Sequence, residues 1–294
     1  MDADPLYHVK QLFYQASYKA CVAEASSSDL GLPARLYAAR SHLALSPPNT
    51  PAAKELVSSA ETPGAKAVLA LGRYLADEDK AARVDEVRDL VIESEGADEE
   101  EETEEAVIRA IAGTVFILEG ENEEAIATLT EGKAKEDLEC MALLVQLLLS
   151  LDRRDLAQSI YSQAKRIGND STLVQAMEAW IGLKTGSRPL HQSYYYYEEL
   201  YQLPSGRTHP VLASHAAAHL LLGHVDEAKA DVNEALQREG GDKDGDVLAV
   251  GTSLRMDGFA EKLASAAPKH PFAVDLAEKM RAFDEAASKF TITA

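Results

Sequence analysis

The sequence predicts an all-α protein, folded as a right-handed tetratricopeptide-like α-solenoid of about seven to eight helical pairs. Composition is the first reason: 48 alanines and 36 leucines stand among 294 residues, against 17 glycines and 11 prolines. Alanine and leucine lose little free energy on entering a helix. The second reason is that no turn dipeptide typical of a hairpin is flanked by alternating apolar and polar residues. The third is an internal repeat of the helix-turn-helix type.

The repeat is clearest in three segments of the chain. The first runs from Ala112 to Leu129, the second from Leu144 to Tyr161 and the third from His215 to Val232. In each, small or apolar residues stand where the two helices of a pair must touch, and a polar turn separates the helices. This spacing is typical of the tetratricopeptide repeat, a helix-turn-helix unit of about 34 residues.

Weaker copies extend the array in both directions. The small or apolar residue that opens each second helix marks the register, and the markers recur every 31 to 36 residues except for one interval of 41. The eight markers are Cys21, Ala53, Val84, Ala125, Ala157, Ser193, Ala228 and Leu263. Single helical pairs cannot bury their apolar faces alone, so we expect one domain over residues 1–294. A closing helix is expected near 272–290, where four apolar residues recur at helical spacing: Phe272, Leu276, Met280 and Phe283.

The long interval contains an acidic segment, residues 93–105, with nine acids and no base. A block of like charges repels itself and tends to stay disordered. The segment is therefore predicted to be an inserted, solvated loop that contributes little to stability or to partner binding.

The overall charge limits the classes of partner. A formal net charge of −20 argues against direct binding to nucleic acid or anionic lipid, because both require a basic surface. No apolar run reaches the roughly 18 residues that a membrane span needs, and the acidic N-terminus is not typical of a signal peptide. Two cysteines are too few for a disulfide framework. We expect a cytoplasmic protein without direct membrane insertion.

Two histidines have a spacing that occurs in metal sites. His215 and His219 are spaced i, i+4, which can place two imidazoles on one zinc ion. No glutamate follows His215, as a metalloprotease motif requires, and both histidines stand at packing positions of the repeat. We therefore expect them to pack between helices and predict no metal site.

A second spacing resembles the beginning of a calcium-binding loop: Asp242, Asp244 and Asp246. Val247 takes the place of the required glycine, and Ser253 stands where the bidentate acid should be. An exposed turn between repeats is the expected structure. No phosphate-binding glycine-rich loop and no nucleophile elbow occurs in the sequence.

Four consecutive tyrosines, Tyr194–Tyr197, form an unusual aromatic run. Four successive residues cover most of a helix circumference, so some should face inward and others outward. Packing between repeats is expected, with an exposed anchor for a partner as the alternative, because tyrosine is common at interface hot spots. Trp180 is expected in the core, and Cys140 is expected to be a buried, unreactive thiol. Since no catalytic set of residues is found, the sequence predicts no enzyme and no cofactor.

The stretch from Leu138 to Ala157 is the most distinctive part of the chain, with L-E-C followed by V-Q-x-L-L-x-L-D-R-x-D-L-A. Further distinctive stretches are Phe13-Tyr14-x-Ala16-Ser17-Tyr18-x-x-Cys21, Thr172-Leu173-x-Gln175 with Ala179-Trp180, Thr185-Gly186, Tyr194-Tyr195, Ala216-Ala217-x-His219, Glu234-Ala235-Leu236 and His270-Pro271-Phe272. Together they resemble the epsilon subunit of coatomer, the COPI vesicle coat, over almost the whole chain in order. The acidic segment 93–105 departs from the family pattern.

This resemblance implies a non-catalytic structural subunit of the COPI coat. It implies binding to the C-terminal domain of the coatomer alpha subunit, which the chain would stabilise, and indirect contact with the other coatomer subunits. It also implies a peripheral position on the cytosolic face of Golgi and COPI-coated vesicle membranes, reached through the rest of the coat. The processes implied are Golgi-to-endoplasmic-reticulum retrograde transport and intra-Golgi transport.

We expect the partner to bind in the concave groove formed by the first helices of successive repeats, because curvature exposes a long row of side chains to one ligand. The alternative is that these residues pack against neighbouring repeats. The repeat register and the tyrosine run predict the following partner-binding residues: Thr114, Ile117, Gln146, Leu149, Ala213, Ala217, Leu220 and Tyr195.

A rival interpretation is a tetratricopeptide adaptor or co-chaperone that binds another protein's peptide. A groove for acidic C-terminal peptides needs clustered bases to pair with carboxylates. The corresponding helices, expected at 106–118, 139–150 and 210–222, contain one base, Arg109. The rival is therefore disfavoured.

Overall fold

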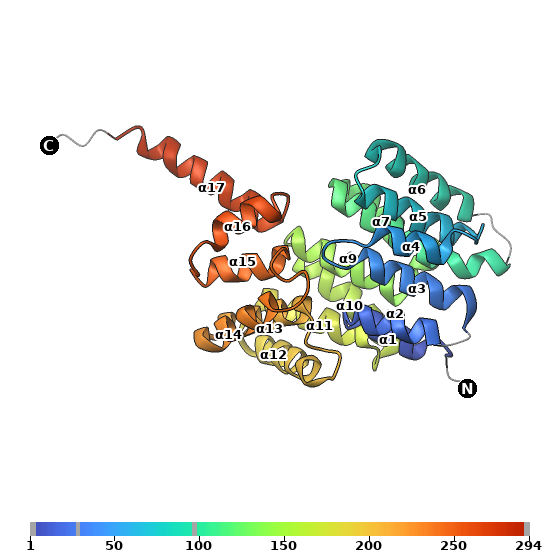
Figure 1. Cartoon of the computed structure of the whole chain (residues 1–294), viewed down its shortest axis with the longest axis horizontal. Helices are drawn as coiled ribbons and strands as arrows, with labels where there is room; N and C mark the ends of the chain where they lie inside the picture. The colour runs from blue at the N-terminus through green and yellow to red at the C-terminus, as the bar shows by residue number, and fades with distance from the viewer. Residues whose placement is uncertain (1–3, 28–29, 96–98, 291–294) are drawn as a thin grey trace. The chain divides into compact units, whose positions relative to one another are not determined.

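The computed structural model describes residues 4–27, 30–95 and 99–290, and for residues 99–103 it describes the backbone alone. Within these ranges it contains seventeen α-helices, one 3₁₀ helix and no strand, which confirms the predicted all-α solenoid (Figure 1). The helices are α1 (Tyr7–Tyr14), α2 (Tyr18–Ser27), α3 (Gly31–Leu43), α4 (Thr50–Val57), α5 (Pro63–Leu75), α6 (Lys80–Ser94), α7 (Glu99–Glu119), α8 (Asn122–Thr130), η1 (Gly132–Lys135), α9 (Leu138–Ser150), α10 (Arg154–Gly168), α11 (Thr172–Thr185), α12 (Ser187–Gln202), α13 (His209–Leu222), α14 (Val225–Leu236), α15 (Gly245–Ser253), α16 (Phe259–Ala266) and α17 (Pro271–Ala287).

The helices form eight consecutive pairs, from α1–α2 to α15–α16, and α17 follows the last pair. All eight predicted markers lie on the second helices of these pairs, and every one of them is buried. A small side chain at this position lets the two helices of a pair approach closely. The repeat register predicted from the sequence is therefore confirmed for every pair.

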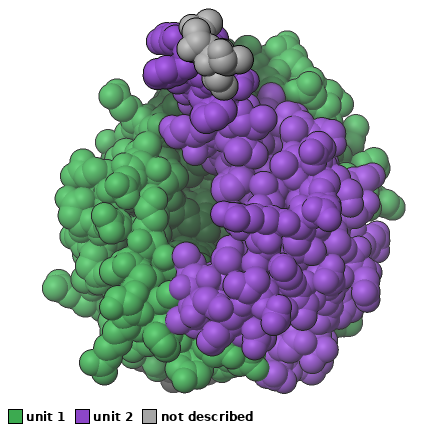
Figure 2. Space-filling model, turned by 90° about the vertical axis from the view of Figure 1, so that its left-hand side faces the viewer, with its two compact units in different colours: residues 1–200 green, residues 201–294 purple. Residues whose placement is uncertain are grey.

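The chain divides into two compact units, residues 1–200 and residues 201–294, where the sequence predicted a single domain. Figure 2 colours the two units separately. Buried apolar clusters fill the first unit, centred on α3–α7, on α9–α11 and on α1–α3. A separate cluster, built from α13 to α17, fills the second unit. Each unit thus has an apolar core of its own.

Helix boundaries follow the local sequence. Asp137 caps α9, since its side chain accepts a hydrogen bond from the backbone N–H of Cys140 at 2.9 Å. Asp244 caps α15 in the same way, through the N–H of Val247 at 3.0 Å. Such caps satisfy backbone donors that have no partner inside the helix.

The acidic segment 93–105 differs from its predicted loop structure. Helix α6 continues to Ser94 and α7 begins at Glu99, so most of the segment is helical; residues 96–98 lie outside the described residues. Glutamate is a good helix former, and a base one turn later compensates its charge. Glu105 is buried because the Arg109 side chain donates to its Oε1 at 2.6 Å. The expectation that the whole segment is solvated is corrected accordingly.

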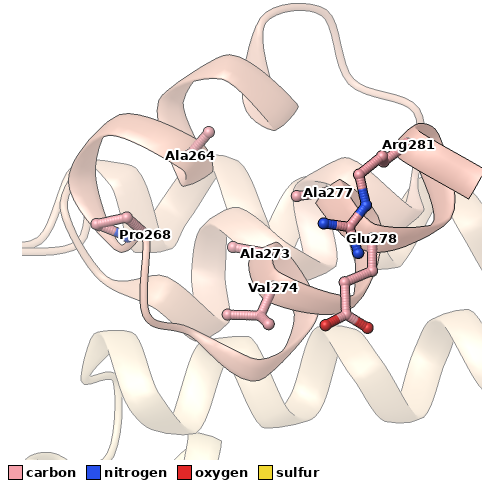
Figure 3. A pocket seen from close by; sticks show the side chains of 7 residues that line it. All are labelled: Ala264, Pro268, Ala273, Val274, Ala277, Glu278 and Arg281. Carbon is pink, nitrogen blue, oxygen red and sulfur yellow. The ribbon is translucent and has the colours of Figure 1, made fainter.

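The last helix, α17, lies close to the expected range 272–290, but it leaves most of its apolar side chains exposed. Ala273 is buried, whereas 60% of Met280 and 72% of Phe283 are exposed. A cavity of about 480 Å³ lies beside it, and Figure 3 shows the seven side chains that line this cavity. The lining residues are Ala264, Pro268, Ala273, Val274, Ala277, Glu278 and Arg281.

Candidate functional site

The predicted partner-binding residues occupy four helices. Thr114 and Ile117 lie on α7, and Gln146 and Leu149 lie on α9, all in the first unit. Tyr195 lies on α12 of the same unit, and the remaining residues lie on α13 of the second unit: Ala213, Ala217 and Leu220.

These residues differ widely in accessibility. Leu149 is 8% exposed and belongs to the α9–α11 cluster, and Ala213 is buried in the core of the second unit. The Thr114 hydroxyl donates to the carbonyl of Ala110 at 2.7 Å, so it is engaged within its own helix. Gln146 is exposed. Many of the predicted residues therefore also serve packing, and Gln146 is accessible to a partner.

The tyrosine run divides between core and surface as its helical spacing predicts. Tyr197 is buried, whereas Tyr195 is 66% exposed and its ring lies 5.4 Å from that of Tyr194. Burial, together with the neighbouring Tyr197, raises the pKa of Tyr196. Tyr195 is thus the exposed member of the run, while Tyr194 and Tyr196 are half-buried.

Sequence reasoning missed a buried polar network between α1, α3 and α9. Arg40 forms an ion pair with Glu139, and both side chains are buried. The Tyr14 hydroxyl donates to Glu139 Oε2 at 3.1 Å and lies 3.2 Å from the Tyr37 hydroxyl. The guanidinium of Arg40 lies 4.7 Å from the centre of the Phe13 ring. This network joins the first helices of the first, second and fifth pairs.

The Tyr14 hydroxyl is in the protonated form that its hydrogen bond to Glu139 requires. Burial, with the neighbouring Tyr37, raises the pKa of Tyr14, so its hydroxyl remains a donor at neutral pH. One sequence signal pointed to these residues: Phe13-Tyr14 and Leu138-Glu139 are two of the distinctive stretches that carry the family resemblance. What the sequence did not show is that the two stretches meet.

The base required by the rival adaptor interpretation is not available to a peptide. Arg109 is 1% exposed, and its guanidinium donates to Glu105 Oε1, to Glu95 Oε1 at 3.0 Å and to the carbonyl of Thr128 at 3.3 Å. A carboxylate clamp needs exposed bases. Arg109 therefore cannot bind the carboxylate of a peptide, and it was the one base on the three helices predicted to form the groove.

The remaining candidate residues have structural contacts. Cys140 is buried, and burial raises the pKa of its thiol well above the usual value, as expected for an unreactive cysteine. Asp244 caps α15 and lies 3.1 Å from His209 Nδ1, while Asp246 Oδ1 lies 3.0 Å from His270 Nε2. Asp244 therefore caps a helix and pairs with His209, and Asp246 pairs with His270.

His215 and His219 are buried, as their packing positions predict. Asp231 of α14 lies beside them, with its Oδ2 at 3.0 Å from His215 Nδ1 and 3.9 Å from His219 Nε2. Within the described part of the chain, these three residues are the group whose donor atoms lie close enough together to hold a metal ion.

The fold defines a tetratricopeptide-like α-solenoid, a class of repeat protein that presents extended surfaces to other proteins. Two solved structures share this fold. Cut9–Hcn1, an APC/C hetero-tetramer, has a TM-score of 0.57 at 14% identity over 92% of this chain and 54% of that one. A tetratricopeptide repeat protein from Parabacteroides merdae has a TM-score of 0.51 at 12% identity over 84% of this chain and 90% of that one.

Sequence comparison identifies the family within this class. The family model of the coatomer epsilon subunit matches residues 2–291, and the chain belongs to that family. Similar relatives include coatomer subunit epsilon-1 of Oryza sativa, 29% identical over 84% of this chain and 82% of the relative. Coatomer subunit epsilon of Caenorhabditis elegans is 25% identical over 97% of this chain and 98% of the relative.

Among the helices described, none has the length and apolar character to cross a membrane.

Proposed function

We propose that this chain is a non-catalytic structural subunit of the COPI coat that binds and stabilises the C-terminal domain of the coatomer alpha subunit. It contacts the other coatomer subunits indirectly and supports Golgi-to-endoplasmic-reticulum retrograde and intra-Golgi transport. The observation that carries the proposal is the family match, which spans residues 2–291 and therefore both compact units.

The charge of the chain supports recruitment through the coat rather than by lipid. The formal net charge is −20, which disfavours binding to an anionic membrane surface. A peripheral position on the cytosolic face of Golgi and COPI-coated vesicle membranes then depends on other coatomer subunits. The same charge favours a partner with a neutral or basic contact surface.

Partner binding is best tested by substituting predicted residues whose side chains are exposed. Leu149 supports the α9–α11 core, so an acidic substitution there would lower stability as well as binding. Gln146 and Tyr195 are exposed, and their substitution leaves the core intact. These two side chains are therefore the proposed contacts to change.

The test measures binding of the purified chain to the isolated C-terminal domain of the alpha subunit by calorimetry. Tyr195→Ala and Gln146→Arg are expected to weaken binding at least about tenfold, since interface anchors often contribute 2 kcal/mol or more. Tyr7→Ala is the matched control, because Tyr7 is similarly exposed, on α1. If the unmodified chain fails to bind that domain, the proposed partner is wrong. If binding is intact in both variants, the partner contacts other residues.

A further inference from the structure

A compact cluster of metal-ligating side chains lies inside the second unit. His215 and His219 are one helical turn apart on α13, so their rings share a face, and the ring centres are 4.5 Å apart. Asp231 lies on α14, the helix that pairs with α13, and its side chain meets both rings. All three residues are buried, and they are 3%, 7% and 7% exposed.

The distances in this cluster suit a zinc ion. Zinc binds imidazole nitrogens and carboxylate oxygens at about 2.0–2.2 Å, usually in a tetrahedron, so neighbouring donor atoms lie about 3.3 Å apart. Asp231 Oδ2 lies 3.0 Å from His215 Nδ1 and 3.9 Å from His219 Nε2, values on either side of that separation. The three donor atoms lie within 4.8 Å of one another. Small side-chain rotations would bring them to the required geometry.

The surroundings would orient the ligands. When zinc is bound by one ring nitrogen of a histidine, the other usually has a hydrogen-bond partner that fixes the ring. His219 directs Nε2 toward Asp231, and its Nδ1 lies 3.3 Å from His224 Nδ1. The ring of Tyr201 stacks on His215, with the ring centres 5.3 Å apart, and restricts the orientation of that imidazole.

One neighbour of the cluster, His224 at the N-terminus of α14, is exposed to solvent.

From these observations, the geometry points to a zinc site formed by His215, His219 and Asp231, which joins α13 to α14 inside the second unit. Two imidazoles and one carboxylate leave a fourth position for water. The site is independent of the proposed role in the coat, because its ligands are buried and belong to one helical pair. The spacing of the histidines alone gave no third ligand; Asp231, on the facing helix, supplies it.

The test uses the full-length chain, stripped with a chelator and then titrated with zinc and with cobalt. One equivalent of zinc should bind, measured by elemental analysis after desalting, and should raise the thermal unfolding midpoint. Cobalt should give the intense visible absorption of a tetrahedral site, and zinc should abolish it. Asp231→Asn and His219→Gln should lower the affinity by more than about 100-fold, because even loss of an outer partner costs 10- to 100-fold.

Two further variants complete the design. His224→Gln should weaken binding by about 10- to 100-fold if it orients His219. His191→Gln is the control, since His191 is exposed on α12 and should leave both affinity and cobalt absorption unchanged. Circular dichroism establishes that each variant is folded. The inference is overturned if the unmodified chain shows no stoichiometric zinc and no tetrahedral cobalt absorption, or if the folded variants bind zinc as tightly as the unmodified chain.

Discussion

Arg40 on α3 and Glu139 on α9 stand 99 positions apart in the sequence and form a buried ion pair inside the first unit. Burying two charges is costly, and the cost is offset only when their remaining polar atoms are satisfied. Tyr14 donates to the carboxylate, and the rings of Phe13 and Tyr37 lie beside the guanidinium. The pair therefore fixes α3 against α9.

Glu139→Gln should destabilise the protein by about 3–5 kcal/mol, because it leaves the Arg40 charge buried and uncompensated. Chemical denaturation followed by circular dichroism measures the loss. Glu285→Gln is the matched control on α17, where the side chain is exposed, and it should change the free energy of unfolding by less than about 0.5 kcal/mol.

A double variant separates the pair interaction from the cost of an orphaned charge. Arg40→Met combined with Glu139→Gln should recover part of the stability that Glu139→Gln alone loses. Removing both charges destabilises the protein less than leaving one charge buried without its partner. Strictly additive losses in the double variant would show that the two side chains do not interact.

Gly182→Ala should destabilise α11 against α12 by about 1–3 kcal/mol through overpacking. A methyl group there would lie 2.7 Å from the carbonyl oxygen of Pro189 and would also clash with the Ser193 hydroxyl. Gly72→Ala is the matched helical control, since its methyl would make ordinary contacts with Thr50 and Leu43. Alanine is the better helix former, so that variant should be neutral or more stable by up to about 1 kcal/mol. Equal thermal midpoints for the two variants would contradict this packing account.

Asp244 should make the stability of the second unit sensitive to acid. Burial alone would raise the pKa of Asp244, but hydrogen bonds from His209 and from the Val247 N–H outweigh it and lower the pKa. A lowered folded pKa stabilises the protein above the unfolded pKa of about 3.9, and the contribution is lost as the pH falls through the folded value.

Asp244→Asn keeps a good helix cap but loses the charge. It should cost about 1–3 kcal/mol at pH 6 and less as the pH approaches 3, because hydrogen bonds to charged groups are worth about that much. Asp246→Asn, two positions away and exposed, should cost less than about 1 kcal/mol at either pH. Thermal unfolding across this pH range measures both, and a cost for Asp244→Asn that does not change with pH would count against the charged pairing.

Phe283→Ala should leave stability within about 0.5 kcal/mol of the unmodified chain, because the Phe283 side chain is exposed. Phe259→Ala is the matched comparison: Phe259 on α16 is buried in the core of the second unit, and its truncation should cost about 3–5 kcal/mol. A large loss for Phe283→Ala in chemical denaturation would mean that α17 covers the core, as the predicted closing helix implies.

The helical class and the repeat register can be predicted from the sequence alone. Small residues such as Ala125, Ala157 and Ala228 recur because two paired helices must approach closely, and this requirement is local and therefore visible as a spacing. Helical spacing also predicts that the tyrosine run has both inward and outward members, and the structure shows Tyr197 buried and Tyr195 exposed. Helical periodicity links each position to a face without any knowledge of distant contacts.

The contacts between buried polar residues, in contrast, depend on how the helices pack. Glu139 and Arg40, or Asp231 and His215, come together when helices that are separate in the sequence pack, and no spacing encodes those partners. The acidic segment 93–105 differs from its predicted loop structure for another reason: Glu105 and Arg109 are four residues apart on one helix, but their pairing becomes decisive only when both side chains are buried. A buried charge is tolerated only beside its partner, and in these two inter-helix pairs packing alone brings that partner into contact.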